Sequence, residues 1–321
     1  GASMFQSLEP RTLLAAPEPI GPVYFAAEPQ TSSFLGERMS VDGEWAVMGA
    51  RLDDNVNGAN AGAAYVFQRV GETWVERTKL LSTDGRADDR FGNAVAISGN
   101  TIVVGASIRD EGTIQDLGAA YVFVRGDDGV WTEQAKLLAG DGTLRDRFGD
   151  QVAIDGDTVM IGAYREDGPG LTDIGATYVY QRTGTEWSQI QKLQAPDADG
   201  REWFGRSIGI RGGWAFISAD TDDTSFGVDT GSVYAFEFSG GTWSFVQKII
   251  ASDARQGARF GQSLAYDGTT LVIGAPRDDN SSLIGAGSAY VYTLVEGVWT
   301  RQLKVLPATP SHDQFFGAAV A

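Results

Sequence analysis

The 321-residue chain contains no cysteine and a single histidine, His312. The absence of cysteine excludes disulfides and metals held by thiolates. One histidine excludes a zinc site with several imidazoles from the same chain. A Ser-His-Asp triad would have to use His312, which lies in the polar segment Pro310-Ser311-His312-Asp313 and is expected to be an ordinary surface residue.

Basic residues and long apolar runs are also scarce. The 25 Lys and Arg face 42 Asp and Glu, which gives a formal net charge of −17. Because nucleic acids and anionic membranes bind to basic surfaces, we expect neither as a partner. No apolar run approaches the roughly 18 residues that a membrane span requires, so no span is expected. An acidic chain of this kind is compatible with an extracellular location and with binding of divalent cations.

Glycine, by contrast, is abundant, and its positions reveal an internal repeat. Three sets of residues recur every 56 or 57 positions, and repeats of this length indicate stacked supersecondary units. The tryptophans are followed five residues later by lysines, and the glycines keep the same interval. The three sets are Trp74, Trp131, Trp187, Trp243 and Trp299; Lys79, Lys136, Lys192, Lys248 and Lys304; and Gly36, Gly92, Gly149, Gly205, Gly261 and Gly317.

Each unit contains four short runs rich in β-branched and aromatic residues, separated by turn signals. In the second unit we expect strands A to D at 92–98, 101–106, 118–124 and 131–139. A small antiparallel sheet buries its faces by packing on copies of itself, and radial repetition does this in a β-propeller. The sequence therefore predicts an all-β propeller of four-stranded antiparallel blades, with five complete repeats and an incomplete sixth.

The fifth unit carries a family signature: Phe260-Gly261, then Gly274-Ala275-Pro276, then a strand starting at Gly287. In these motifs residues 34–321 resemble the bacterial FG-GAP repeats, which are similar to the propeller of integrin α chains. The resemblance implies a propeller that is often extracellular and concerned with binding. The other units depart from the signature, and the first unit reads as if Leu35 were inserted inside its Phe-Gly pair. The calcium loops of integrins lie between strands A and B, where this chain has only short turns, so they are not carried over.

The N-terminal segment needs a separate interpretation. Residues 1–3 precede Met4 and have the composition of a cloning scar. Residues 4–33 include Leu8-Glu9-Pro10-Arg11, which resembles the LEPR-XLL motif of planctomycete surface or secreted proteins. Residues 11–15 also resemble the end of a strand D, and such a strand could close the ring beside the terminal strand A. Alternatively, the natural protein continues past Ala321, the last blade is incomplete, or a second copy completes it, which would make a homo-oligomer.

Acidic residues concentrate in the B–C loops and in the loops from strand D to the next strand A, which emerge on one face of a propeller. Loops on a rigid scaffold commonly carry function, so this face is the predicted ligand face. Two B–C loops place paired Asp directly before Asn, and carboxylate and amide oxygens suit calcium. Asp–Arg pairing and turn capping are the alternative. The candidate calcium ligands are Asp53, Asp54, Asn55, Asp278, Asp279 and Asn280, and the other candidate face residues are Asp110, Asp167, Asp222, Asp223 and Trp203.

Two functions remain open from the sequence. The first is an extracellular or envelope-associated binding or adhesion propeller, whose ligand is a protein, a polysaccharide or a small molecule. The second is a metal-dependent hydrolase or lyase, in which loop carboxylates hold calcium as a Lewis acid and activate water. Fold resemblance alone does not choose between them.

Overall fold

The structure is a computed structural model that describes residues 33–279 and 283–321. Its described part contains twenty strands and no helix that could span a bilayer. The strands form five separate sheets, and in each sheet four consecutive strands pair antiparallel in chain order. The predicted four-stranded unit is therefore confirmed in all five repeats.

Each blade begins just after its Phe-Gly position, or the equivalent position in the first unit, and ends before the next one. The strands are, in the first blade, β1 (Met39–Asp42), β2 (Trp45–Ala50), β3 (Ala63–Val70) and β4 (Thr73–Leu80); in the second, β5 (Ala94–Ser98), β6 (Thr101–Ala106), β7 (Ala119–Arg125) and β8 (Trp131–Leu137); in the third, β9 (Gln151–Asp155), β10 (Thr158–Ala163), β11 (Ala176–Thr183) and β12 (Glu186–Leu193); in the fourth, β13 (Ile208–Arg211), β14 (Trp214–Ala219), β15 (Ser232–Ser239) and β16 (Thr242–Ile249); and in the fifth, β17 (Ser263–Tyr266), β18 (Thr270–Ala275), β19 (Ser288–Val295) and β20 (Val298–Val305).

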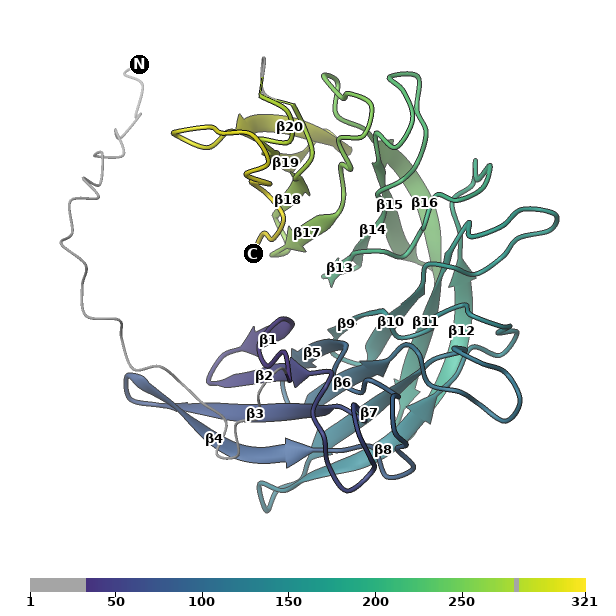
Figure 1. The fold of residues 1–321 in the computed structure, drawn as a ribbon, viewed down its shortest axis with the longest axis vertical. Helices are drawn as coiled ribbons and strands as arrows, with labels where there is room; N and C mark the ends of the chain where they lie inside the picture. The colour runs from purple at the N-terminus through teal and green to yellow at the C-terminus, as the bar shows by residue number, and fades with distance from the viewer. Residues whose placement is uncertain (1–32, 280–282) are drawn as a thin grey trace.

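The five blades lie along an arc, with the first strand of each blade innermost (Figure 1). Each inner strand contacts the inner strand of the next blade, from β1 through β5, β9 and β13 to β17. The first and fifth blades stand at the two ends of the arc (Figure 1). This is the radial packing predicted from the repeat.

The hydrophobic core lies between blades, because each sheet is covered by its neighbour. One buried cluster joins residues of the second and third blades, and another joins the third and fourth. The phenylalanine of the Phe-Gly pair sits in this layer. Phe148, for example, is fully buried and meets the rings of Tyr178 and Tyr180 edge-on at 5.4 and 6.1 Å. Edge-to-face contacts of this kind add to the burial of apolar area.

Glycine is required where neighbouring blades touch through their backbones. A Cβ at Gly105, at the end of β6, would lie 2.0 Å from the carbonyl oxygen of Gly149 in the next blade. A contact of this length excludes any side chain, which explains the recurring glycine of the GAP position. The fourth blade differs, because Ser218 holds this position and its Cβ lies close to Gly261.

The first unit contains no insertion, contrary to the interpretation of Leu35 given above. Leu35 packs against the first blade's core, at the position that phenylalanine holds in later blades. Phe34 takes the place of Arg90, and both have a left-handed backbone, with φ of 57° and 54°. Counting back 56 residues from Arg90 and Phe91 gives the same alignment. The motif is therefore Leu35-Gly36, with a leucine in place of phenylalanine.

The start of the sixth repeat docks on the fifth blade in the usual way. Phe316 pairs with Gly287 in a short parallel bridge, as Phe148 pairs with Gly118 between the second and third blades. The carbonyl of Gly317 accepts a hydrogen bond from the Ser263 hydroxyl at 2.8 Å. The predicted closing strand at residues 11–15, and the whole N-terminal segment up to residue 32, lie outside the described residues.

Candidate functional site

The B–C loops share one construction, which the repeat places on the same face of every blade. In each loop an Asp side chain accepts a hydrogen bond at 2.8–2.9 Å from the amide six residues later. The accepting residue comes directly after a more buried position, and the donating residue has a left-handed backbone, with φ between 49° and 62°. Asn, Asp and Gly tolerate that conformation best. The pairs are Asp54 with Asn60, Asp110 with Asp116, Asp167 with Asp173, Asp223 with Asp229, and Asp279 with Gly285.

The residue before each of these Asp side chains points inward and is buried. In the first blade, the Asp53 carboxylate accepts a hydrogen bond from the Tyr65 hydroxyl at 2.7 Å and pairs with Lys79 at 2.8 Å. In the fifth, Asp278 pairs with Lys304 at 2.7 Å. In four blades the recurring lysine thus neutralises a buried carboxylate, whereas in the second blade Lys136 pairs with Asp84 and Glu111. The inward position holds Asp53, Arg109, Glu166, Asp222 and Asp278, all between 1% and 6% exposed.

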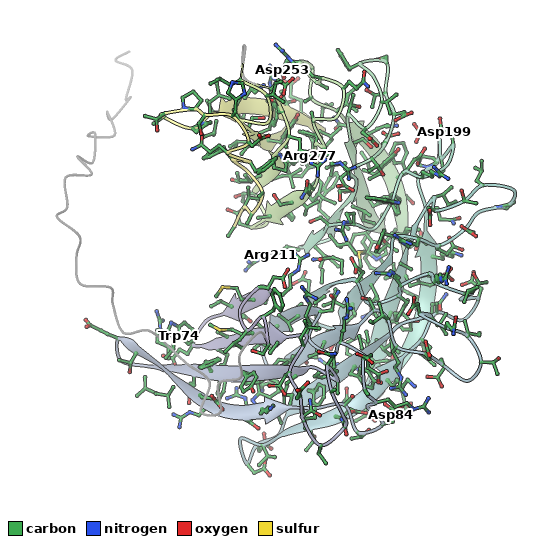
Figure 2. The ribbon with its side chains drawn as sticks, in the orientation of Figure 1. Trp74, Asp84, Asp199, Arg211, Asp253 and Arg277 are labelled. Carbon is green, nitrogen blue, oxygen red and sulfur yellow. The ribbon has the colours of Figure 1, made fainter. Side chains whose placement is uncertain are left out.

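From the second blade onward, the same lysines also bind a carboxylate from the preceding D–A loop. The Asp197 carboxylate, for instance, lies 2.7 Å from the Lys248 ammonium and 2.8 Å from the Tyr234 hydroxyl. Partial burial raises the pKa of Asp197, but the hydrogen bonds from Lys248 and Tyr234 outweigh it and hold the pKa below its ordinary value. The lysine therefore links the inter-blade loop to the blade that follows. The other loop carboxylates are Asp84, Asp141 and Asp253, the first and last of which are labelled in Figure 2.

The two predicted calcium loops follow this pattern, so their paired carboxylates separate. Asp53 and Asp278 are held by lysines inside the loop, whereas the Oδ1 atoms of Asp54 and Asp279 cap it from outside. The Asn55 amide group donates to the Gly62 carbonyl at 2.9 Å, and Asn280 lies outside the described residues. Within the described ranges, no group of three or more His, Asp or Glu side chains is placed to hold a metal. Calcium at these loops stays a prediction.

The other predicted face residues fall into two kinds. Asp110, Asp167 and Asp223 are exposed and occupy the outer, loop-capping position. Asp222 is 2% exposed and pairs with Lys248 at 2.8 Å, so it belongs to the buried network. Of these four carboxylates, a partner could therefore reach Asp110, Asp167 and Asp223 but not Asp222.

Trp203, in the D–A loop before the fourth blade, lies in a cluster of aromatic and charged groups. Its ring meets Tyr164 edge-on at 5.7 Å, and the Arg259 guanidinium lies 5.3 Å from its centroid. Arg206 stands 4.9 Å from the Tyr164 centroid and pairs with Asp150 at 2.7 Å. The cluster joins the third, fourth and fifth blades on the loop face.

Two buried acids beside this cluster were not singled out from the sequence. Asp220 is 1% exposed and lies 3.6 Å from Arg259; burial raises its pKa, and Arg206 and Arg259 oppose the rise. Burial raises the pKa of Glu202 to about 7. Glu202 accepts the Asp199 amide at 2.7 Å with one carboxylate oxygen. The sequence did contain a signal for Glu202, because the fourth unit has Glu202-Trp203 where the second and third units have Asp-Arg before their Phe-Gly pair.

The axis of the arc is hollow. A cavity of about 490 Å³ is bounded by the inner strands of several blades and by the C-terminal residues, and its polar lining includes Glu37, Arg38, Gln151, Arg206, Ser207, Gln262 and Ser263. These side chains carry one negative and two positive charges, with several amide and hydroxyl groups. The lining of the axial cavity is therefore mixed in charge, unlike the acidic loops.

The comparisons with known proteins agree with this architecture. The profile of the FG-GAP repeat family matches five times, at residues 25–67, 74–123, 131–180, 187–236 and 243–292. No curated protein matches the chain. A solved structure from Bacteroides uniformis, named as a candidate 6-phosphogluconolactonase, aligns over 91% of this chain and 76% of its own with 13% identity and a TM-score of 0.54, which supports the fold alone. With five matches over most of its length, the chain belongs to the FG-GAP repeat family.

Proposed function

We propose that this protein is a binding or adhesion module, extracellular or associated with the cell envelope, whose ligand face is formed by the B–C and D–A loops. One observation carries the proposal: every B–C loop is fixed by the same internal hydrogen bond, accepted by an Asp side chain near the start of the loop. Rigid loops lower the entropy that binding costs. FG-GAP repeats are typical of extracellular or surface proteins, and this supports the proposed extracellular or envelope location.

Charge supports a partner with a basic surface. The inward carboxylates are buried and paired with lysines, whereas the outer caps Asp110, Asp167 and Asp223 are exposed and add negative charge to this face. The net charge of −17 would attract a basic partner over a distance set by the ionic strength. Opposite charge increases association rates and helps to orient the partner.

The test compares two triple variants in binding to a fluorescent polylysine probe. Asp110→Asn with Asp167→Asn and Asp223→Asn removes three charges from the loop face, and each Asn keeps an oxygen that can cap its loop. The control, Glu72→Gln with Asp127→Asn and Glu186→Gln, removes three exposed charges at the C–D hairpins of the opposite face. We expect affinity to fall about tenfold or more in the first variant and to change little in the control. Equal losses in both variants would mean that only net charge matters.

Calcium remains a second proposal for the same face, supported by the oxygen chemistry of the outer caps. We place the candidate ion at the outer carboxylates of Asp54 and Asp279, because the inward Asp53 and Asp278 are each only 1% exposed. A ligand that binds only the folded state raises Tm, and the rise grows with the ligand concentration relative to its Kd. We expect Tm to rise with millimolar calcium, to fall back with chelator, and to respond less in Asp54→Asn with Asp279→Asn. An unchanged Tm in the parent protein refutes the calcium site.

The alternative of a metal-dependent hydrolase or lyase stays a prediction. No observation in the described residues favours it over binding, and the name of the solved structure applies to that protein only. Turnover of an ester, phosphotriester or polysaccharide substrate that is lost in Glu202→Gln or Asp220→Asn would overturn the binding proposal.

A further inference from the structure

The face opposite the loops carries a second repeated position, at the end of the third strand of each blade. This residue is the cross-strand partner of the recurring tryptophan. The first three blades have arginine there, the fourth has phenylalanine and the fifth has leucine. The residues are Arg69, Arg125, Arg182, Phe238 and Leu294, opposite Trp74, Trp131, Trp187, Trp243 and Trp299.

In the second blade the arginine lies against two tryptophans that also contact each other. The Arg125 guanidinium carbon is 4.2 Å from the ring centroid of Trp45, in the first blade, and 5.8 Å from that of Trp131. One of its nitrogens donates to the side-chain oxygen of Asn100 in the adjacent A–B turn. Cation–π attraction and a hydrogen-bond acceptor together hold the guanidinium.

The third blade repeats this arrangement with other neighbours. The Arg182 guanidinium carbon lies 5.1 Å from the Trp187 centroid, and its Nε donates to Asp157 at 2.7 Å. Asp157 holds the turn position of Asn100. Thr101, which stands where the first blade has Trp45, accepts from Arg182 Nη1 at 3.1 Å. Two blades therefore place a guanidinium group at the same point.

The fifth blade has a matching pair of tryptophans but no arginine, and Phe216 and Tyr266 also pack against Trp299. Trp214 and Trp299 meet edge-on at 5.4 Å and 79°, close to the 5.9 Å and 72° of Trp45 and Trp131. The arginine position holds Leu294, and Thr269 holds the acceptor position in the turn. A groove of about 500 Å³ is present here, lined by Trp214, Tyr266, Thr269, Thr293, Leu294 and Trp299.

We propose that this groove between the fourth and fifth blades binds a guanidinium group, such as an arginine side chain of a partner. In the second blade the chain's own arginine occupies the matching space, which shows what the paired tryptophans accept. Arg211 and Asp267, the charged groups beside the groove, carry opposite signs and both influence Tyr266. The net charge of −17 favours a cationic guest over an anionic one. The groove lies on the face opposite the proposed ligand face, so the two proposals stand independently.

The test follows binding of argininamide through the indole N–H resonances of Trp214 and Trp299 in the full chain. Leu294→Arg should fill the groove with an internal guanidinium and weaken binding by about tenfold or more. Arg125→Leu should open the matching space in the second blade, and the indole signal of Trp45 should then also respond to argininamide. Since Leu294 is 41% exposed, the Leu294→Arg variant is expected to fold, and a thermal melt checks this.

Two matched probes serve as controls. Lysinamide carries the positive charge without the planar guanidinium group, and methyl glucoside presents a sugar ring without charge. Tighter binding of argininamide, lost in Leu294→Arg, supports the proposal. Equal binding in parent and Leu294→Arg places the guest elsewhere and overturns it. Binding of the glucoside alone, or no shift with any probe, also overturns it. The triple Asn variant of the loop face should leave these indole shifts unchanged whether or not the loop-face proposal is correct.

Discussion

At the scale of single residues, the recurring lysine explains why so many acids can stand beside one another between blades. Lys248 lies 2.7 Å from Asp197 and 2.8 Å from Asp222, and Asp222 is 2% exposed. Removing one partner of a buried ion pair leaves a charge without compensation, which is more costly than losing the pair.

We therefore expect Lys248→Met to reduce the free energy of unfolding by about 3 kcal/mol. Adding Asp222→Asn should restore part of this loss, because the uncompensated charge is then removed. Urea unfolding of the parent, the single variant and the double variant measures both effects. A single variant within about 0.5 kcal/mol of the parent would show that the lysine pairs contribute little.

Glu202 gives the molecule a stability that depends on pH. Burial raises its pKa to about 7 from an ordinary value of 4.5, so the folded state favours the protonated form. Its favourable contribution is present below pH 4.5 and is lost as the pH rises through 7. We expect Glu202→Gln to be more stable than the parent at about pH 8, by about 2 kcal/mol, and nearly equal at about pH 4.5.

Urea unfolding at the two pH values, with exposed Glu186→Gln as the control, checks the Glu202 prediction. The amide side chain introduced by Glu202→Gln keeps an oxygen that can accept the Asp199 amide hydrogen, so the comparison isolates the charge. Equal stability of parent and variant at the higher pH would contradict the buried ionisation.

At the scale of elements, the B–C loop is the unit that the repeat copies. Asp110 accepts the Asp116 amide at 2.9 Å, and Asp116 has a left-handed backbone with φ of 49°. We expect Asp110→Ala to lower the free energy of unfolding by about 1 kcal/mol and to speed hydrogen exchange at the Asp116 amide. Asp110→Asn should have smaller effects on both, because its side chain keeps an oxygen that can accept this hydrogen bond. If alanine leaves that exchange rate unchanged, the loop is fixed by other contacts.

The elements themselves were predictable, because strand content, order and blade boundaries follow from residues that recur every 56 or 57 positions. The directions of adjacent side chains were harder to predict. Asp53 and Asp54 look alike in the sequence, yet one is buried on Lys79 and the other caps the loop. The lysine lies far from its acid along the chain, and only the sheet brings them together. The Trp214 groove was missed because its signal is an absence: Leu294 stands in the fifth repeat where the first three have arginine.

At the scale of the whole molecule, the two faces of the disc differ in chemistry. The loop face is acidic and its B–C loops are fixed by internal hydrogen bonds. The opposite face is formed by short hairpins and contains the groove lined by Trp214 and Trp299. Between them, the inter-blade core and the glycine contacts hold the blades in register. A partner with a basic surface should therefore meet the loop face first.

Hydrogen–deuterium exchange with and without a saturating basic probe tests this directly. Polylysine at low ionic strength should slow exchange in the B–C and D–A loops, such as 107–118 and 164–175, and leave the C–D hairpins at 70–73 and 183–186 unchanged. High salt should abolish the protection, because it screens exposed charges. Protection confined to the hairpins, or spread equally over both faces, would contradict the assignment of the ligand face to the acidic loops.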